Sequence, residues 1–155
     1  MRLLRLTFYV AMVFTTMVVS CEKPAPIPEE LPTIEVSYDT IEGSWQLTHL
    51  NGAELLDDSM LYIVFENTAE EDAVRRYEMW DNLGSMYLVQ TTGTYTITEE
   101  NGNYTLSGTY DNGVGDWNER YHVVMYTNDR MQWRSDNGEC LEFKYTIELP
   151  EEFNK

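Results

Sequence analysis

Basic residues are scarce in this chain. Among its 155 residues, 10 Lys and Arg stand against 27 Asp and Glu, so the formal charge is −17. Nucleic-acid binding depends on cationic side chains that displace phosphate counterions, so this charge excludes a nucleic-acid partner. A bare anionic membrane surface would also repel the chain, so attachment to a membrane needs a covalent anchor. The length allows one modest domain.

Residues with catalytic or metal-binding chemistry are also few. The only histidines, His49 and His122, lack the paired spacing of a zinc site. No Gly-x-Ser-x-Gly motif supplies the nucleophile turn of a hydrolase. One alternative is calcium at a glycine-rich loop that carries Asp111, Asp116 and Glu119, although their spacing does not fit an EF-hand. We therefore expect no enzyme, no cofactor and no metal.

Long apolar runs are missing except at the N-terminus. Arg2 and Arg5 precede an acid-free run over residues 6–19, so residues 1–20 are predicted to be a secretory signal peptide. The run ends in Val18-Val19-Ser20-Cys21, which resembles the lipobox of bacterial lipoproteins. The resemblance implies cleavage before Cys21 and attachment of acyl chains such as palmitate to that residue. Several acyl chains hold a protein stably at a bilayer.

Proline is concentrated in a tether that follows the lipidation site. Residues 21–38 contain four of the five prolines, which favour an extended, stiff spacer. Glu22 stands where some bacteria place the Asp linked with retention in the inner membrane, so we expect an outer-membrane location in the cell envelope. With Cys21 lipidated, Cys140 has no partner for a disulfide, and we interpret it as a solvent-facing strand residue.

Period-two alternation of apolar side chains predicts β-strands throughout residues 39–150, followed by a short tail at 151–155. Trp45, Leu47 and His49 are expected to face inward together. No helix is predicted. The dipeptides Asn101-Gly102 and Asn137-Gly138 are typical of hairpin turns. The expected strands cover residues 44–50, 61–66, 74–81, 84–99 (bent or divided at Gly93), 103–110, 119–127, 131–135 and 140–147, the last with Leu141, Phe143, Tyr145 and Ile147 inward.

About eight strands joined by short turns predict an all-β fold. Because a flat sheet of that size leaves two open edges, we expect a small antiparallel up-and-down β-barrel. A Gly-hydroxyl-aromatic triplet occurs three times, and its glycine lets the sheet coil while the aromatic ring plugs the barrel. The triplets are Gly43-Ser44-Trp45, Gly93-Thr94-Tyr95 and Gly108-Thr109-Tyr110.

The first triplet resembles the Gly-x-Trp signature of lipocalins and other calycins. Together with later segments, it makes residues 41–150 similar to small lipocalin-like lipoproteins of Bacteroides-type bacteria. The resemblance implies an up-and-down barrel, a monomer and no catalytic chemistry, and it names no ligand. Calycins often carry an arginine over the Trp on the last strand, where this chain has Lys144 and Tyr145. The later segments are Phe65-Glu66, Tyr77-Glu78-Met79, Gly84-Ser85-Met86, Gly93-Thr94-Tyr95 and Ser107-Gly108-Thr109-Tyr110.

Two functions from different classes remain open. In the first, the barrel mouth binds a small apolar or aromatic ligand. In the second, side chains fill the barrel, and the lipid-tethered domain docks an envelope protein or glycan through an exposed Trp80 or Trp117. The residues expected to line a ligand site in the first are Trp45, Tyr95, Tyr110 and Trp133.

Two short motifs concern modification rather than binding. Asp39-Thr40-Ile41 and Asp58-Ser59-Met60 resemble sites that Bacteroides-type bacteria O-glycosylate. Both lie outside the expected strand interiors, which leaves their hydroxyls open to modification.

Overall fold

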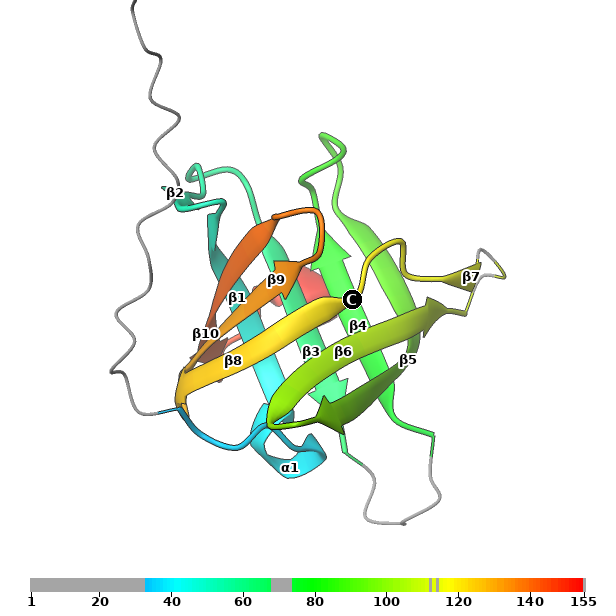
Figure 1. Ribbon diagram of the computed structural model, residues 1–155. Helices are drawn as coiled ribbons and strands as arrows, with labels where there is room; N and C mark the ends of the chain where they lie inside the picture. Colours follow the sequence, from blue (N-terminus) through cyan, green and yellow to red (C-terminus); the bar gives the residue numbers. More distant parts are fainter. Residues whose placement is uncertain (1–32, 68–73, 112, 114, 155) are drawn as a thin grey trace, which may run out of the picture.

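The computed structural model describes residues 33–67, 74–111, 113 and 115–154 (Figure 1). The predicted signal peptide, the lipidation site Cys21 and nearly all of the proline-rich tether lie outside these residues. The described helices are α1 (Tyr38–Ile41) and the 3-10 helix η1 (Glu151–Asn154). The strands are β1 (Gly43–Leu50), β2 (Ala53–Glu54), β3 (Leu61–Glu66), β4 (Arg76–Asp81), β5 (Val89–Glu100), β6 (Asn103–Tyr110), β7 (Gly115–Asp116), β8 (Tyr121–Thr127), β9 (Arg130–Ser135) and β10 (Cys140–Thr146).

The sheet closes on itself as an antiparallel barrel. Apart from the short strands β2 and β7, each strand pairs with the next one along the chain, and β10 returns to pair with β1, with Trp45 opposite Tyr145. The two-residue strands β2 and β7 lie beside this ring, which leaves eight strands in the closed barrel. The predicted all-β, up-and-down architecture is therefore confirmed, including the closing pair of strands.

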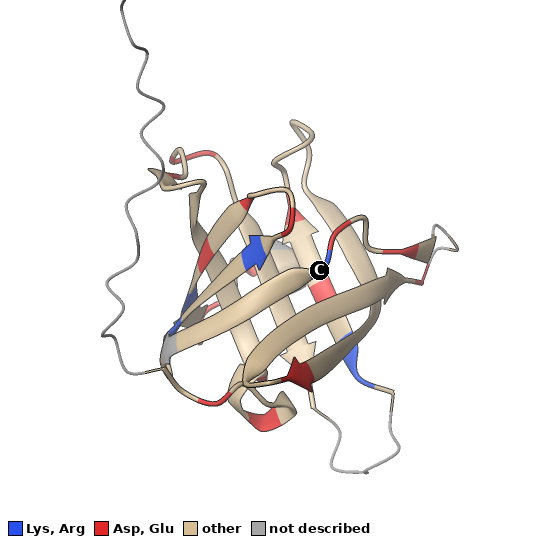
Figure 2. Ribbon diagram, in the orientation of Figure 1, with Lys and Arg blue, Asp and Glu red and all other residues tan. Residues whose placement is uncertain are grey.

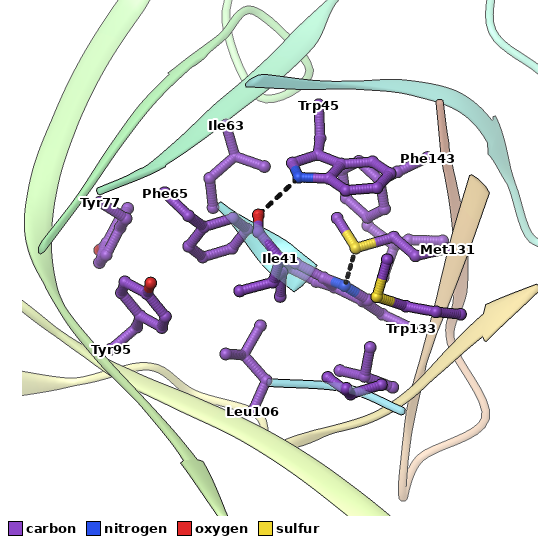
Figure 3. Packing of buried hydrophobic residues seen from close by; sticks show 14 of the residues in the cluster. Ile41, Trp45, Ile63, Phe65, Tyr77, Tyr95, Leu106, Met131, Trp133 and Phe143 are labelled. Carbon is purple, nitrogen blue, oxygen red and sulfur yellow. Dashed lines mark hydrogen bonds between the residues drawn. The ribbon is translucent and has the colours of Figure 1, made fainter. Parts of the chain in front are cut away.

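The barrel interior is filled by the inward residues of each strand (Figure 3). Trp45 has no exposed surface, and Ile63, Phe65 and Leu106 are equally buried. Burying large apolar side chains is the main favourable term in folding, at about 25 cal/mol per Å². The alternation that predicted these strands therefore also gave the correct inward face for most of them.

The prediction that the chain contains no helix is wrong. Ser37 caps α1: its hydroxyl accepts from the Thr40 backbone N–H, and the Thr40 hydroxyl accepts from the Ser37 N–H at 2.7 Å. This reciprocal pair is a capping box. The last residue, Ile41, is fully buried, and its carbonyl accepts a hydrogen bond from the Trp45 indole at 2.8 Å (Figure 3). Packing therefore begins before β1, and Ile34 already forms a bridge to Met125.

Two inward assignments are corrected by the structure, and a third is met only in part, because Tyr145 packs edge-on against Trp45 at 5.4 Å but is 36% exposed. A β-bulge after Leu47 shifts the β1–β10 register, so the His49 side chain is 40% exposed and lies 3.8 Å from Glu142. Ile147 lies beyond the end of β10 and is 86% exposed. Strict alternation fails in both places because a bulge or a strand end changes which face the next side chain occupies.

Gly93 lies where the backbone of the paired strand β6 comes close to β5. A Cβ at this position would stand 1.8 Å from the Thr109 carbonyl oxygen, which only glycine avoids. The segment expected as one bent strand or two short ones is a single strand, β5, that begins at Val89, and residues 82–88 form a loop. The expected strand at 74–81 likewise begins later, at Arg76.

The C-terminal turn covers the outer face of the barrel. In η1, the Phe153 ring stacks on Trp80 at 4.8 Å, with 8° between the planes, and lies edge-on to Tyr62 at 5.4 Å. Trp80 is therefore buried, and its predicted role as an exposed docking anchor is wrong.

Among the described residues, no helix has the length and apolar character needed to cross a membrane.

Candidate functional site: a filled interior beside a polar hollow

Three of the four aromatic residues expected to line a ligand site belong to the buried core cluster. Trp45, Tyr95 and Trp133 are 0%, 3% and 5% exposed, whereas Tyr110 is half-buried. The Tyr95 ring lies 4.7 Å from that of Phe65, in the edge-on geometry that aromatic pairs favour. Burial raises the pKa of Tyr95, whose hydroxyl donates to the Glu66 carbonyl at 3.2 Å.

Trp133 occupies the centre of this packing. Its ring centroid lies 4.5 Å from that of Phe143, and its indole N–H points at the sulfur of Met131 at 3.3 Å (Figure 3). None of the four predicted ligand residues lines either of two hollows found on the described part of the chain. The interior contacts are those of a packed core.

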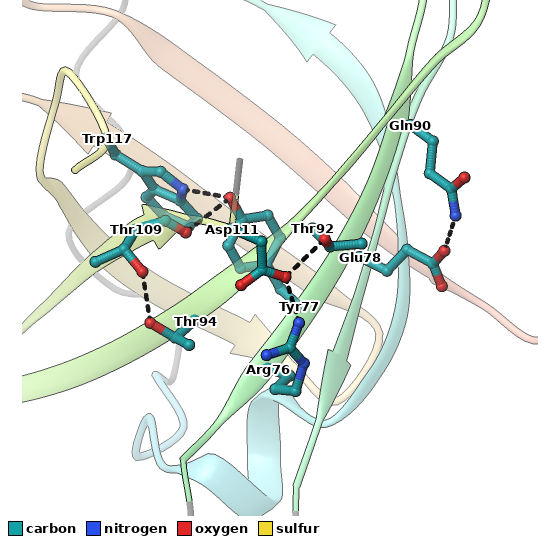
Figure 4. A network of polar contacts seen from close by, with 9 residues as sticks. All are labelled: Arg76, Tyr77, Glu78, Gln90, Thr92, Thr94, Thr109, Asp111 and Trp117. Carbon is teal, nitrogen blue, oxygen red and sulfur yellow. Dashed lines mark hydrogen bonds and ion pairs between the residues drawn. The ribbon is translucent and has the colours of Figure 1, made fainter. Parts of the chain in front are cut away.

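Trp117 closes the side of the barrel where β6 parts from β8. Only residues 104–106 of β6 pair with β8, and the end of β6 pairs with β7 instead. The Trp117 backbone N–H donates to the Gly108 carbonyl at 2.8 Å, and its indole donates to the Tyr77 hydroxyl at 2.8 Å (Figure 4). A Cβ on Gly108 would stand 2.4 Å from the indole, so glycine makes room for the ring.

Tyr77, whose hydroxyl accepts the indole hydrogen bond of Trp117, lies inside the barrel. Burial raises the pKa of Tyr77, and the hydrogen bond from Trp117 opposes that rise. Tyr77 in turn donates to the Thr109 carbonyl at 3.3 Å. The half-buried Trp117 ring also lies near Trp133 at 6.1 Å. Trp117 therefore belongs to the wall of the core, with one edge toward solvent.

The larger hollow, about 300 Å³, lies outside this wall. Its floor is a two-by-two array of hydroxyls on the outer faces of β5 and β6, since Thr94 pairs with Thr109 and Thr96 with Ser107. The rest of the lining comes from the end of β7 and the segment that follows it. These residues are Asp116, Trp117, Asn118, Glu119 and Arg120.

A polar network borders this floor (Figure 4). Asp111 accepts from the Thr92 hydroxyl at 2.7 Å and pairs with the Arg76 guanidinium. The Thr92 hydrogen bond and the Arg76 charge hold the pKa of Asp111 below its usual range. The Thr94 and Thr109 hydroxyls share a hydrogen bond of 2.7 Å. Both strands thus present fixed polar groups beside the hollow.

The acids considered for calcium are separated by this arrangement. Asp111 is held in the network, whereas Asp116 and Glu119 line the hollow, where Glu119 accepts from the Asn137 amide at 2.9 Å. Within the described ranges, no three His, Cys, Asp or Glu side chains gather as a metal site.

The remaining singled-out residues have structural surroundings. Cys140 is half-buried and free, and burial raises the pKa of its thiol, which disfavours the reactive thiolate. The Thr40 hydroxyl donates to the Glu35 carbonyl at 3.0 Å and is part of the α1 cap. Ser59 is half-buried in the loop before β3. The smaller hollow, about 130 Å³, lies where the segment around Ile34 crosses β8.

The comparison with protein families decides the wider relationship. The model of the lipocalin-like domain matches residues 41–133, which is more than half of the chain. The chain belongs to the lipocalin-like domain family. The search of curated proteins and the search of solved structures each returned no match. The match runs from before β1 into β9, so this lipocalin-like barrel agrees with the resemblance carried by Gly43-Ser44-Trp45.

The polar hollow could not be found by inspecting single motifs. Its hydroxyls come from two paired strands, and its carboxylates come from a segment later in the chain. The alternation of threonines with Tyr95 and Ile97 was a partial signal, because it placed hydroxyls together on one outer face. What the alternation could not show is that residues 116–120 fold beside that face.

Proposed function

We propose that this protein is a lipid-anchored binding module of the outer membrane, with a filled barrel and a polar ligand site on its outer wall. In this proposal the acyl chains on Cys21 hold the domain at the membrane. The ligand is a neutral, hydroxyl-rich molecule such as a glycan unit. The packing of the interior supports this second function over the first one considered, in which an apolar ligand binds inside the barrel.

The observation that carries the proposal is the packing of the barrel interior. Trp45, Phe65 and Trp133 occupy the space that an apolar ligand would need, and Trp117 closes the gap between β6 and β8. An eight-stranded barrel can be filled by its own side chains or can hold one small ligand, and the buried aromatic and aliphatic cluster of this chain corresponds to the filled form. Binding on the outer wall requires no rearrangement of that core.

The lining of the hollow determines the class of ligand. Carboxylates and hydroxyls accept hydrogen bonds from sugar hydroxyls, while Asn118 and Arg120 donate to them. The acidic side chains and the charge of −17 disfavour an anionic ligand. The volume of about 300 Å³ lies at the small end of ligand sites and suits one sugar unit.

The hollow is tested by a pair of matched double variants. Thr96→Val with Ser107→Ala removes two floor hydroxyls, whereas Thr98→Val with Thr105→Val changes the next pair along the same strands, outside the hollow. Binding to an array of neutral oligosaccharides, followed by titration calorimetry of any hit, should fall at least several-fold for the first variant only. Equal binding by both variants would contradict a site at this hollow.

The filled barrel is tested by tryptophan fluorescence during titration with palmitate, haem and a small aromatic compound. We expect no saturable quenching. Stoichiometric quenching by any of them would contradict a filled barrel and support an apolar or aromatic ligand inside it. The anchor is tested separately by incorporation of labelled palmitate in cells, which Cys21→Ser should abolish together with recovery in the membrane fraction.

A further inference from the structure

The loop between β4 and β5 presents an unusual apolar surface. Met86 is 92% exposed and Tyr87 is 76% exposed, and they are flanked by Leu83, Leu88 and Val89 at 38–45%. No charged residue occurs from 82 to 98, and Figure 2 shows this loop without acidic or basic colour. Clustered exposed apolar side chains of this kind mark a binding surface more often than an accident of the fold.

Local hydrogen bonds hold this loop in place. The Asn82 side chain accepts from the Met60 backbone N–H and donates to the Asp58 carbonyl, both at 2.7 Å, which ties the loop to the segment before β3. That segment carries another apolar side chain, Leu56, which is 73% exposed. The Ser85 hydroxyl accepts from the Tyr87 N–H at 3.0 Å. The apolar side chains are thus presented by a bonded pair of loops.

We propose that the 82–89 segment inserts its apolar side chains into the surface of the lipid bilayer that holds the chain. This inference rests on the proposed lipid anchor. Met, Leu and Val side chains gain free energy in the acyl region, and tyrosine favours the boundary between lipid and water. A second copy of this chain is a poor occupant, because two molecules with a charge of −17 repel each other.

The length of chain before the barrel allows this orientation. Figure 1 shows the loop at the end of the barrel away from α1, while the described chain enters beside α1. Residues 22–33 lie between the predicted lipidation site and Ile34. Extended at about 3.3–3.6 Å per residue, they span roughly 40 Å. An eight-residue strand such as β1 rises only about 26 Å. The tether can therefore run past the barrel and bring the loop to the bilayer.

Acidic residues beside the loop should limit how deeply it inserts into the bilayer and which lipid headgroups it prefers. Asp57 and Asp58 lie in the linked segment, and the Asp81 carboxylate accepts from the Leu83 N–H at 3.2 Å. Charged side chains disfavour the hydrocarbon interior, so insertion should stop near the headgroups. The same acids are repelled by anionic lipids, so a zwitterionic surface should be preferred.

The test uses the chain from Glu22 onward, with Cys140→Ser and an N-terminal hexahistidine in place of the acyl anchor. The protein is bound to phosphatidylcholine vesicles that contain a nickel-chelating lipid. A polarity-sensitive fluorophore is attached through Met86→Cys or, as the matched control, through Ile147→Cys, an equally exposed apolar position outside the loop. Lipids brominated near the top of the acyl chains act as the quencher.

We expect a blue shift and several-fold stronger quenching at position 86 than at position 147. Adding phosphatidylglycerol at low salt should reduce the quenching at position 86. Equal quenching at both positions, or none at position 86, would overturn the proposal and leave an apolar protein partner as the occupant. Because the hexahistidine replaces the acyl chains, this outcome is independent of whether Cys21 is lipidated.

Discussion

Two aromatic clusters lie on opposite faces of the strands β3 and β4. The sequence predicted the inner cluster but not the outer one. The inner cluster includes Phe65 and Tyr77, both about 1% exposed, and it continues around the whole barrel. The outer cluster consists of Tyr62, Trp80 and Phe153, and it depends on the C-terminal turn. Alternation along a strand therefore identifies the inward face but not what covers the outward face.

The clusters should also differ in their importance for stability. Each inner ring contacts residues from several strands, so its loss opens a cavity that the closed barrel cannot collapse to fill. The outer ring of Phe153 belongs to a four-residue terminal turn, which can detach without separating any pair of strands. We therefore expect the inner cluster to hold the fold and the outer cluster to cover one part of its surface.

Replacement of an inner ring should have the largest effect. Trp45→Ala removes a fully buried ring and the indole bond to the Ile41 carbonyl. We expect a loss of about 3–5 kcal/mol in the free energy of unfolding, measured by urea denaturation. The control, Ser44→Ala on the neighbouring half-buried position, should stay within about 0.5 kcal/mol. A small effect of Trp45→Ala would contradict the expectation that the inner cluster holds the fold together.

The close approach of β6 to β5 at Gly93 should be the next most sensitive feature. Gly93→Ala places a Cβ against the Thr109 carbonyl, and the backbone must shift to accept it. We expect a loss of about 1–3 kcal/mol or more, because overpacking forces backbone displacement. Gly84→Ala is the matched control, since a Cβ there meets nothing within 4 Å. Thermal unfolding that shifts equally for both variants would contradict this explanation.

Loss of the outer ring should have a modest effect. Phe153→Ala removes the stack on Trp80 and should cost about 1 kcal/mol in unfolding free energy. The indole N–H signal of Trp80 should move in the NMR spectrum, while that of Trp45 should not. If the loss approaches that of Trp45→Ala, the C-terminal turn is part of the cooperative fold rather than a cover.

Alkaline pH should lower the stability of the fold, because it favours ionisation of Tyr95, a tyrosine of the inner cluster. Burial raises the pKa of Tyr95 above its ordinary value of 10.0, so the unfolded chain loses this proton at lower pH than the folded chain. The contribution of Tyr95 to the free energy of unfolding is therefore fully present below about pH 10, and it is lost as the pH rises toward the pKa of Tyr95 in the folded state. At pH 11 the loss is about 1 kcal/mol. Tyr95→Phe should flatten this part of the curve, measured by urea unfolding between pH 8 and pH 11.

Local sequence signals predicted most of the barrel. Asn101 and Gly102 have positive φ angles of 54° and 79°, as the two central residues of a type I′ hairpin turn require. Trp45 faces inward, and the first and last strands pair. The turn and the inward face of Trp45 depend on neighbouring residues and on alternation. The pairing of β1 with β10 follows from the need to remove the two open edges of the sheet, so the sequence was sufficient for these features.

The features that were missed depend on distant or irregular contacts. The bulge at His49 shifts a register that alternation treats as continuous. Trp80 looked exposed because its cover, Phe153, lies far along the chain. The helix α1 was too short for periodicity, and its capping box has Thr40 in place of the usual Glu or Gln. The polar hollow requires tertiary placement of residues 116–120 beside β5 and β6.

The way the chain enters the barrel has a mechanical consequence. A pull on the N-terminal end of the described chain acts first on the single bridge between Ile34 and Met125, and then on α1. The indole bond from Trp45 to Ile41 is next in line, and behind it β1 is bonded on both sides, to β3 and β10. A modest force can therefore detach and extend the few residues before β1 while the strands of the barrel stay paired.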